Sequence, residues 1–206
     1  KKASDIFISA RAPISIKING TTVPINQQPI EPATVRQLLT EVLTEEQLKV
    51  FERDLELNTA YPIPGLGSFR ISAFVQRGTP AVVVRYIPNH VPQFDTLGLP
   101  PILKEVALEK RGLVLVVGAT GSGKSTSLAA MVDHRNESMS GHIVTVEDPI
   151  EYLFRHKKSI VNQRELGTDF RTYQVALKNV LRQAPDVIFI GEIRDRESMS
   201  MAIQYA

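Results

Sequence analysis

Residues 113–126 read Leu113-Val-Leu-Val-Val-Gly-Ala-Thr-Gly-Ser-Gly-Lys-Ser-Thr126, and no other segment says as much about the fold of the chain. The apolar run 113–117 predicts a buried parallel strand. The following residues fit the pattern G-x-x-x-x-G-K-[ST], a phosphate-binding loop. Ser127-Leu-Ala-Ala-Met-Val132 then predicts a helix. Strand, glycine-rich loop and helix in this order are typical of an α/β fold that holds a nucleotide at the helix N-terminus.

The loop predicts a nucleoside triphosphate ligand with Mg²⁺, because its glycines let backbone N–H groups surround the phosphates. Lys124 is expected to reach the β- and γ-phosphates, and the Ser125 hydroxyl to bind Mg²⁺. The predicted nucleotide-binding residues are Gly118, Thr120, Gly121, Ser122, Gly123, Lys124, Ser125 and Thr126.

The composition allows an ordinary packed core, since 43% of the 206 residues are hydrophobic and 22% are charged. A net charge of +2 favours neither nucleic acid nor an anionic membrane as a partner. The absence of cysteine excludes disulfides and thiolate metal sites, and the four histidines show no metal-ligand spacing. No apolar run approaches the roughly 20 residues of a membrane span, so any membrane attachment is expected to be indirect.

Residues 1–88 predict a small α+β domain. Asn19-Gly20 between two alternating runs predicts a hairpin. Thr34-Val-Arg-Gln37 and Thr44-Glu-Glu-Gln47 each predict a capping box that opens a helix. Two further strands are expected at 69–75 and 81–87, after a turn over 62–67.

Residues 89–101, rich in proline, predict an interdomain linker. From 102 to 206 strands and helices alternate, which predicts a mostly parallel sheet flanked by helices. The expected strands are 113–117, 142–147, 160–164 and 187–190, and the expected helices are 124–138, 173–184 and 196 onward. The chain lacks an initiator Met and a stop signal for its last helix, so we expect it to be a fragment.

Two acidic positions follow expected strands of this second domain. Glu192 follows the strand 187–190, where a phosphate-binding loop needs a carboxylate for Mg²⁺ and the attacking water. Gly191 stands where an Asp usually precedes this Glu. Glu147 and Asp148, before Pro149, are expected at the carboxyl edge of the sheet, where ligands bind. A solvated strand end for Glu192 and an acidic turn for the pair are the alternatives without function.

Three segments together resemble the secretion ATPases, the hexameric motors of type II secretion and type IV pili. They are residues 118–126, residues 146–152 (Val-Glu-Asp-Pro-Ile-Glu-Tyr) and residues 181–195 (Leu-Arg-Gln-Ala-Pro-Asp-Val-Ile-Phe-Ile-Gly-Glu-Ile-Arg-Asp). Residues 110–118, 162–165 and 69–78 resemble the pilus retraction ATPases, the PilT/PilU family. Residues 176–185 and 140–143 are closer to PilU. The resemblance implies a PAS-like N-terminal domain and a RecA-like P-loop ATPase core.

The resemblance also implies roles for individual residues. Glu147 is the expected base or orienter for the attacking water, and Glu192 is expected to act with Mg²⁺. Family arginines from the N-terminal domain, by motif Arg70 and Arg85, are expected at the γ-phosphate. Arg77 is a weaker third candidate, with a surface strand residue as the alternative for each arginine. Arg194 is expected to pair with a carboxylate and to support the site. The family's His box lies beyond residue 206.

The implied function is ATP hydrolysis that drives pilus retraction through domain rotation in a hexameric ring. The implied partners are other copies of the chain, a related retraction ATPase and the inner-membrane pilus platform protein, at the cytoplasmic base of the pilus. An accessory ATP-binding ring with little turnover of its own is the alternative.

Other nucleotide-binding classes fit the sequence less well. A GTPase would carry an Asn-Lys-x-Asp motif and a small-molecule kinase an arginine-rich lid, and neither occurs. A helicase would need a stacking platform for a single strand, and the chain is only 6% aromatic.

Overall fold

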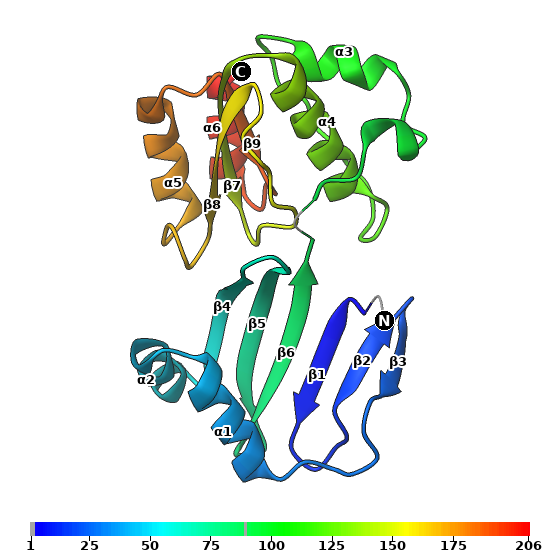
Figure 1. Cartoon of the computed structure of the whole chain (residues 1–206). Helices are drawn as coiled ribbons and strands as arrows, with labels where there is room; N and C mark the ends of the chain where they lie inside the picture. The colour runs from blue at the N-terminus through cyan, green and yellow to red at the C-terminus, as the bar shows by residue number, and fades with distance from the viewer. Residues whose placement is uncertain (1–2, 89) are drawn as a thin grey trace. The chain divides into compact units, whose positions relative to one another are not determined.

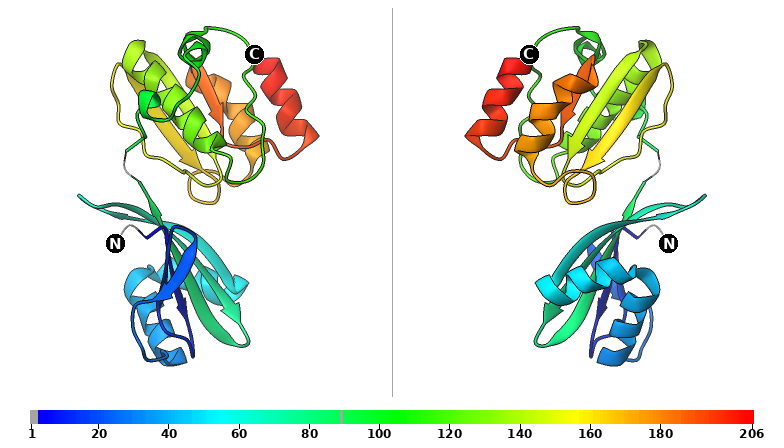
Figure 2. Two further views of the ribbon diagram at one scale, coloured as in Figure 1. Left: turned by 90° about the vertical axis from the view of Figure 1, so that its right-hand side faces the viewer. Right: turned by 90° about the vertical axis from the view of Figure 1, so that its left-hand side faces the viewer.

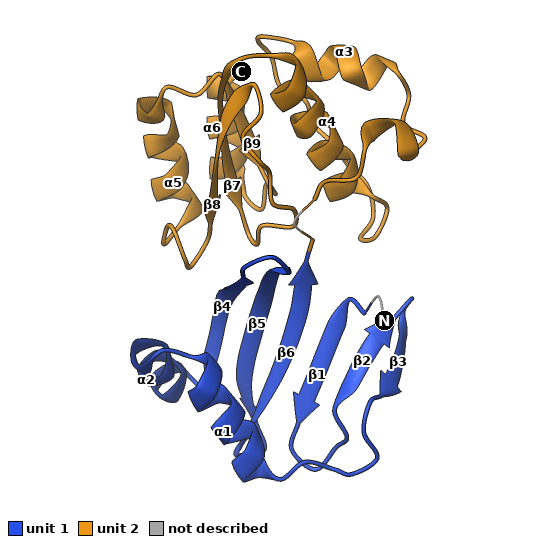
Figure 3. Cartoon of the chain, in the orientation of Figure 1, with its two compact units in different colours: residues 1–87 blue, residues 88–206 orange. Residues whose placement is uncertain are grey.

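The computed structural model describes residues 3–88 and 90–206, which form two compact units, 1–87 and 88–206 (Figures 1 and 3). The first unit is one antiparallel sheet of order β3-β2-β1-β6-β5-β4 with two helices on it. Its elements are β1 (Asp5–Ser9), β2 (Ser15–Ile18), β3 (Thr21–Pro24), α1 (Pro32–Val42), α2 (Glu45–Asp54), β4 (Glu56–Ile63), β5 (Gly67–Gln76) and β6 (Thr79–Ile87).

The two helices cover one face of this sheet because alternate strand residues are apolar. Val35, Leu39 and Phe51 of the helices pack on Ile71 and Val82 of the strands. The neighbouring strand residues point to the opposite face, which is more polar. That face carries Arg70 of β5 and Arg85 of β6, which lie directly opposite each other in the antiparallel ladder.

Some of the sequence-based predictions for the first unit are confirmed, and one is wrong. Asn19 and Gly20 have φ of 48° and 82° and join β2 to β3, as predicted. The capping box at Thr44 is confirmed, with hydrogen bonds in both directions between Thr44 and Gln47. The one at Thr34 is wrong: α1 begins at Pro32 after Glu31, so Thr34 lies inside the helix. Proline at the first helical position starts this helix instead.

The sequence analysis missed β4. This strand pairs with β5 from Glu56 opposite Phe74 to Ile63 opposite Gly67, so the predicted turn over 62–67 begins inside it. Its composition hides it, since Asn58, Ala60 and Pro62 are poor strand formers. Proline is tolerated here because β4 is the edge strand of the sheet.

The second unit is a three-stranded parallel sheet of order β8-β7-β9 between helices. Figure 2 shows α4 on one face and α5 with α6 on the other. The elements are the 3₁₀ turn η1 (Phe94–Thr96), α3 (Ile102–Leu108), α4 (Lys124–Ser138), β7 (Gly141–Glu147), β8 (Ser159–Glu165), α5 (Tyr173–Val180), η2 (Leu181–Gln183), β9 (Val187–Ile190) and α6 (Arg196–Tyr205).

Alternation along β7 assigns each of its side chains to one face of the sheet. Ile143 packs with Val132 of α4 and with Val161. Val146 packs instead with Leu177 of α5 and Met201 of α6. Odd-numbered residues of β7 and β8 therefore face α4 and the phosphate-binding loop, and even-numbered residues face α5 and α6.

The predicted strand 113–117 does not form within the described residues. These residues make no strand ladder, and β9 pairs only with β7. Leu113, Val114, Leu115 and Val117 are 41–91% exposed. A parallel strand exists only through hydrogen bonds to its neighbours, so an apolar run without such a neighbour stays irregular.

Of the predicted linker 89–101, residue 89 lies outside the described residues, and residues 90–101 cluster with the second unit. Phe94 is 8% exposed and packs on Ala130 and Met131 of α4. Buried Arg135 of α4 then holds the end of α3, since its Nη1 donates to the carbonyls of Ala107 and Glu109 at 2.9 and 2.7 Å.

Candidate functional site

The phosphate-binding loop has a backbone that its glycines require. Gly121 and Gly123 have φ of 79° and 92°, a region that side chains disfavour. Gly118 is constrained differently, because a Cβ there would lie 2.8 Å from the Ser122 hydroxyl oxygen. The loop ends where α4 begins, at Lys124, so the free N–H groups of a 15-residue helix lie at the loop. This is the geometry of an anion site.

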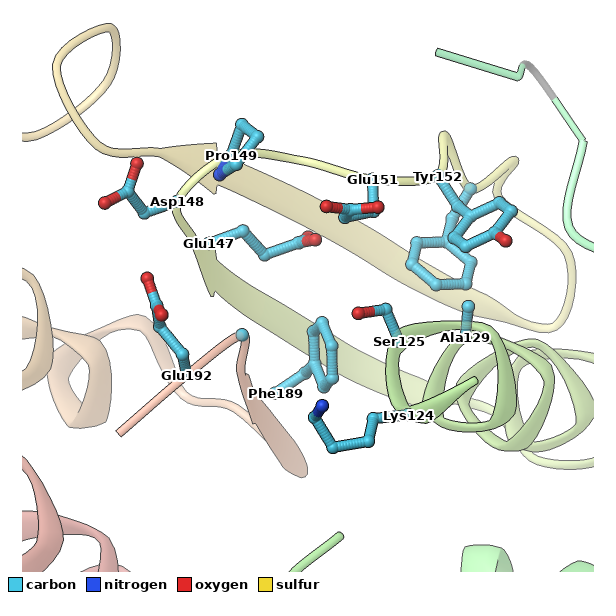
Figure 4. Close-up of a pocket in the computed structure, with 12 residues that line it drawn as sticks. Lys124, Ser125, Ala129, Glu147, Asp148, Pro149, Glu151, Tyr152, Phe189 and Glu192 are labelled. Carbon is cyan, nitrogen blue, oxygen red and sulfur yellow. The ribbon is translucent and has the colours of Figure 1, made fainter. Parts of the chain in front are cut away.

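A cavity of about 180 Å³ lies between the start of α4 and the ends of β7 and β9. Lys124 and Ser125 line it from the helix, Glu147 from the end of β7, and Glu192 from the segment after β9 (Figure 4). Lys124 Nζ donates to the Ala119 carbonyl at 2.8 Å. Four predicted site residues are therefore brought together around one cavity.

Glu147, the last residue of β7, is a buried carboxylate at only 4% exposure. Burial raises its pKa from 4.5 to about 7, against the lowering effect of hydrogen bonds from Thr145, Gln163 and the Glu151 backbone. A carboxylate with a pKa near neutrality exchanges protons readily at physiological pH. Glu147 therefore has the environment of a general base.

Arg194 joins the two other carboxylates of the site. Its Nη2 lies 2.8 Å from Asp148 Oδ2 and 2.5 Å from Glu192 Oε1. The predicted pairing of Arg194 with a carboxylate is confirmed. The interaction with Glu192 raises the pKa of the guanidinium, which stays charged. Arg194 thus links the residues that follow β7 and β9.

Gly191, the atypical residue before Glu192, lies against the backbone of Glu147. A Cβ at Gly191 would approach Glu147 Cα at 3.2 Å and its Cβ and Cγ at 3.5 Å. The Gly191 N–H donates to the Val146 carbonyl at 2.8 Å, which draws the two strand ends together. Glycine therefore leaves room for the side chain of Glu147.

The cavity residues also fit Mg²⁺. Ser125 and Glu192, predicted as its ligands, both line the cavity and offer only oxygen donors. Among the described residues, no group of three or more acidic or histidine side chains could hold a metal alone. In the usual Mg²⁺ site of nucleotide-binding proteins, one or two side chains act together with substrate phosphates.

The predicted arginines lie on the first unit. Arg70 and Arg85 are cross-strand partners, and Arg85 Nε donates to Asp5 Oδ1 at 2.8 Å. Burial opposes ionisation of Asp5, but hydrogen bonds from Arg85 and Ser4 lower its pKa. Arg77 is exposed in the turn between β5 and β6, with φ of 48°, rather than in a strand.

The family is decided by a match over residues 1–206 to the family described as "Type II/IV secretion system protein". The chain belongs to this family. It is 50% identical over 206 residues to the "Type IV pilus ATPase PilU" of Pseudomonas aeruginosa and 42% identical over 204 residues to the same organism's "Type IV pilus retractation ATPase PilT". It covers 54% and 59% of these two relatives, so it spans just over half their length.

Solved structures give the same result for the fold of this type II/IV secretion family member. A crystal structure of the pilus retraction motor PilT with bound ADP matches with a TM-score of 0.93 and 42% identity, over 100% of this chain and 60% of that one. The ATPase DotB of Legionella pneumophila matches with a TM-score of 0.81 and 28% identity, over 99% of this chain and 58% of that one. The predicted α/β fold, a RecA-like core after a small PAS-like domain, is confirmed, as is the resemblance to PilT and PilU.

The sequence analysis missed several side chains that arrange this site. Thr145 donates to Glu147 Oε1 at 2.6 Å, and the hydroxyls of Tyr152 and Thr126 are 2.9 Å apart. Gln163 also contacts Glu147. Alternation along β7 and β8 is a signal that could have found Thr145 and Gln163, because both share the odd-numbered face with Glu147.

Proposed function

We propose that this chain is the ATP-hydrolysing part of a type IV pilus retraction motor. The observation that carries the proposal is the cavity at which Lys124 and Ser125 of the phosphate-binding loop face Glu147 and Glu192. The relatives named as pilus ATPases at 50% and 42% identity support the biological setting.

Each cavity residue has a step in the proposed reaction. The loop N–H groups and Lys124 hold the β- and γ-phosphates. Ser125 and Glu192 would hold Mg²⁺, which would neutralise charge on the phosphate oxygens. Glu147 orients a water and accepts its proton as the water oxygen bonds to the γ-phosphorus. The bond between the γ-phosphorus and the oxygen that bridges to the β-phosphate breaks, which gives ADP and phosphate. Arg194 keeps Asp148 and Glu192 in place.

Two roles in the proposal rest on the family resemblance. Arg70 and Arg85 stabilise charge on the γ-phosphate, which in related enzymes is worth about 10³–10⁵ in rate. Six copies of the complete protein form a ring whose domains rotate as ATP is hydrolysed, at the cytoplasmic base of the pilus, with the inner-membrane platform protein and a related ATPase as partners. Within the described residues, no helix combines the length and apolar character that a membrane crossing requires.

Steady-state hydrolysis of Mg-ATP by the full-length natural protein tests this function. Turnover should fall by at least about 10²-fold in Lys124→Ala and in Glu192→Gln. Binding of a fluorescent ATP analogue should weaken in Lys124→Ala and persist in Glu192→Gln. Tight ATP binding without turnover in the unmodified protein would contradict the proposal and indicate an accessory ring.

A further inference from the structure

Gln163 of β8 joins two parts of the cavity wall through its side-chain amide. Its Nε2 donates to Glu147 Oε1 at 3.2 Å and to the Tyr152 carbonyl at 2.8 Å. Its Oε1 accepts from the Phe154 N–H at 2.8 Å. One half-buried amide therefore uses both donors and its acceptor inside the site.

The position of Gln163 follows from strand alternation. Gln163 is directly opposite Thr145 in the parallel ladder of β7 and β8. Both face α4, as Glu147 does, and both donate to the same carboxylate oxygen. The adjacent Asn162 points to the other face, where its Nδ2 meets His142 Nε2 at 2.8 Å.

Hydrogen bonds connect Gln163, through residues 152–154, to the end of the phosphate-binding loop. Gln163 fixes the backbone at residues 152 and 154. Tyr152 then reaches across the cavity wall to Thr126, the residue after Ser125. The carboxylate of Glu147 and the loop that carries Tyr152 thus share one anchor.

We propose that Gln163 is a positioning residue that sets the orientation of Glu147 for hydrolysis and anchors the 148–154 loop against the nucleotide site. This inference rests on the proposed role of Glu147 as the base. An amide suits the task because it donates to the carboxylate without adding a charge. It also supplies the acceptor for Phe154 N–H that a lysine or arginine would lack.

Charged groups from every neighbouring element define the environment of Glu147. They are Glu165 of β8, Lys124 of α4, Glu192 and Arg194 after β9, and Asp148 and Glu151 of the loop, with the phenol of Tyr173 on α5. Most of these groups are acidic and already disfavour the Glu147 anion. Loss of a hydrogen-bond donor disfavours this anion further. Removal of Gln163 should therefore raise the pKa of Glu147.

Gln163→Leu tests the proposal, with Asn162→Ala as the matched control on the opposite face of the same strand. Gln163→Leu should lower kcat by about 10- to 100-fold, with the ATP dissociation constant changed less than about threefold. The rate of Gln163→Leu should also increase with pH, and the midpoint of this increase should lie at a higher pH than in the unmodified protein. Gln163→Glu keeps the side-chain shape but loses both donors, so it should lower kcat at least as far. Thermal melts of both variants verify folding.

Carboxyl NMR titration of Glu147, assigned with Glu147→Gln, gives a second readout that needs no turnover. An upward shift of the Glu147 pKa in Gln163→Leu, absent in Asn162→Ala, supports the positioning role even if the chain hydrolyses no ATP. An unchanged pKa, or an unchanged kcat and pH profile in an active protein, would overturn it.

Discussion

At the scale of single residues, the site depends on burying a carboxylate that water would otherwise stabilise. Glu147 is 4% exposed and its pKa is raised to about 7. In the unfolded chain the same group titrates near its ordinary value. The folded state therefore binds a proton more tightly, and folding becomes less favourable as pH rises from about 4.5 through 7.

Glu147→Gln should consequently stabilise the protein at pH 8 while it abolishes hydrolysis. The neutral amide oxygen can still accept from Thr145 and Gln163. We expect the free energy of unfolding to rise by about 2 kcal/mol at pH 8. The difference should shrink as pH falls from about 7 to 4.5 and nearly vanish below that, where Glu147 is mostly protonated in both states. Chemical denaturation at several pH values measures it, and a variant less stable than wild type at pH 8 would contradict the burial argument.

Gly191→Ala should impair catalysis through contact with Glu147. The added methyl group would lie 3.2 Å from Glu147 Cα, so one strand end has to move by a few tenths of an ångström. We expect kcat to fall by roughly tenfold with ATP affinity retained. Ser200→Ala, an exposed change on α6, is the control. An undiminished kcat in Gly191→Ala would show that the close packing has no catalytic role.

At the scale of elements, the sequence signals worked where the local pattern is strong and the fold also supplies the partner that the element needs. The Asn19-Gly20 turn, the helix after the phosphate-binding loop and strands β7, β8 and β9 all occur as predicted. Prediction failed where the presence or absence of a neighbouring strand outweighs the local sequence pattern. The apolar run 113–117 lacks a strand partner, and β4 forms from poor strand residues because β5 offers an edge.

The two capping boxes give a matched pair of predictions. Thr44→Ala should lower the free energy of unfolding by about 1 kcal/mol, because Thr44 accepts the Gln47 N–H at the start of α2. Thr34→Ala should cost almost nothing, because Thr34 is exposed inside α1 and alanine is the better helix former. Denaturant unfolding compares them, and equal losses would contradict the cap assignment.

At the scale of the whole molecule, the two units of the chain carry different residues of the proposed reaction. The second unit carries the cavity, while the first presents Arg70 and Arg85 on the sheet face opposite its helices. Sequence motifs identified Lys124, Ser125, Glu147 and Glu192, which the fold brings together. They did not identify Asp5, because its contact with Arg85 spans 80 residues and depends on the pairing of β1 with β6.

Arg70→Ala and Arg85→Ala should each lower kcat by about 10²- to 10³-fold with little change in ATP affinity, since a charge on the γ-phosphate acts mainly in the transition state. Arg77→Ala, in the exposed β5–β6 turn, should stay near the wild-type rate. Parallel assays of turnover and nucleotide binding distinguish these results. Full activity in both Arg70→Ala and Arg85→Ala would exclude them from the reaction.

In the proposed reaction, Glu147 activates the water that attacks ATP. This role is tested by kcat for Mg-ATP hydrolysis by the full-length natural protein and by Glu147→Gln, with ATP binding measured on the same samples. We expect kcat to fall by at least about 10²-fold in Glu147→Gln while ATP binding is retained. Turnover by Glu147→Gln at nearly the wild-type rate would contradict it.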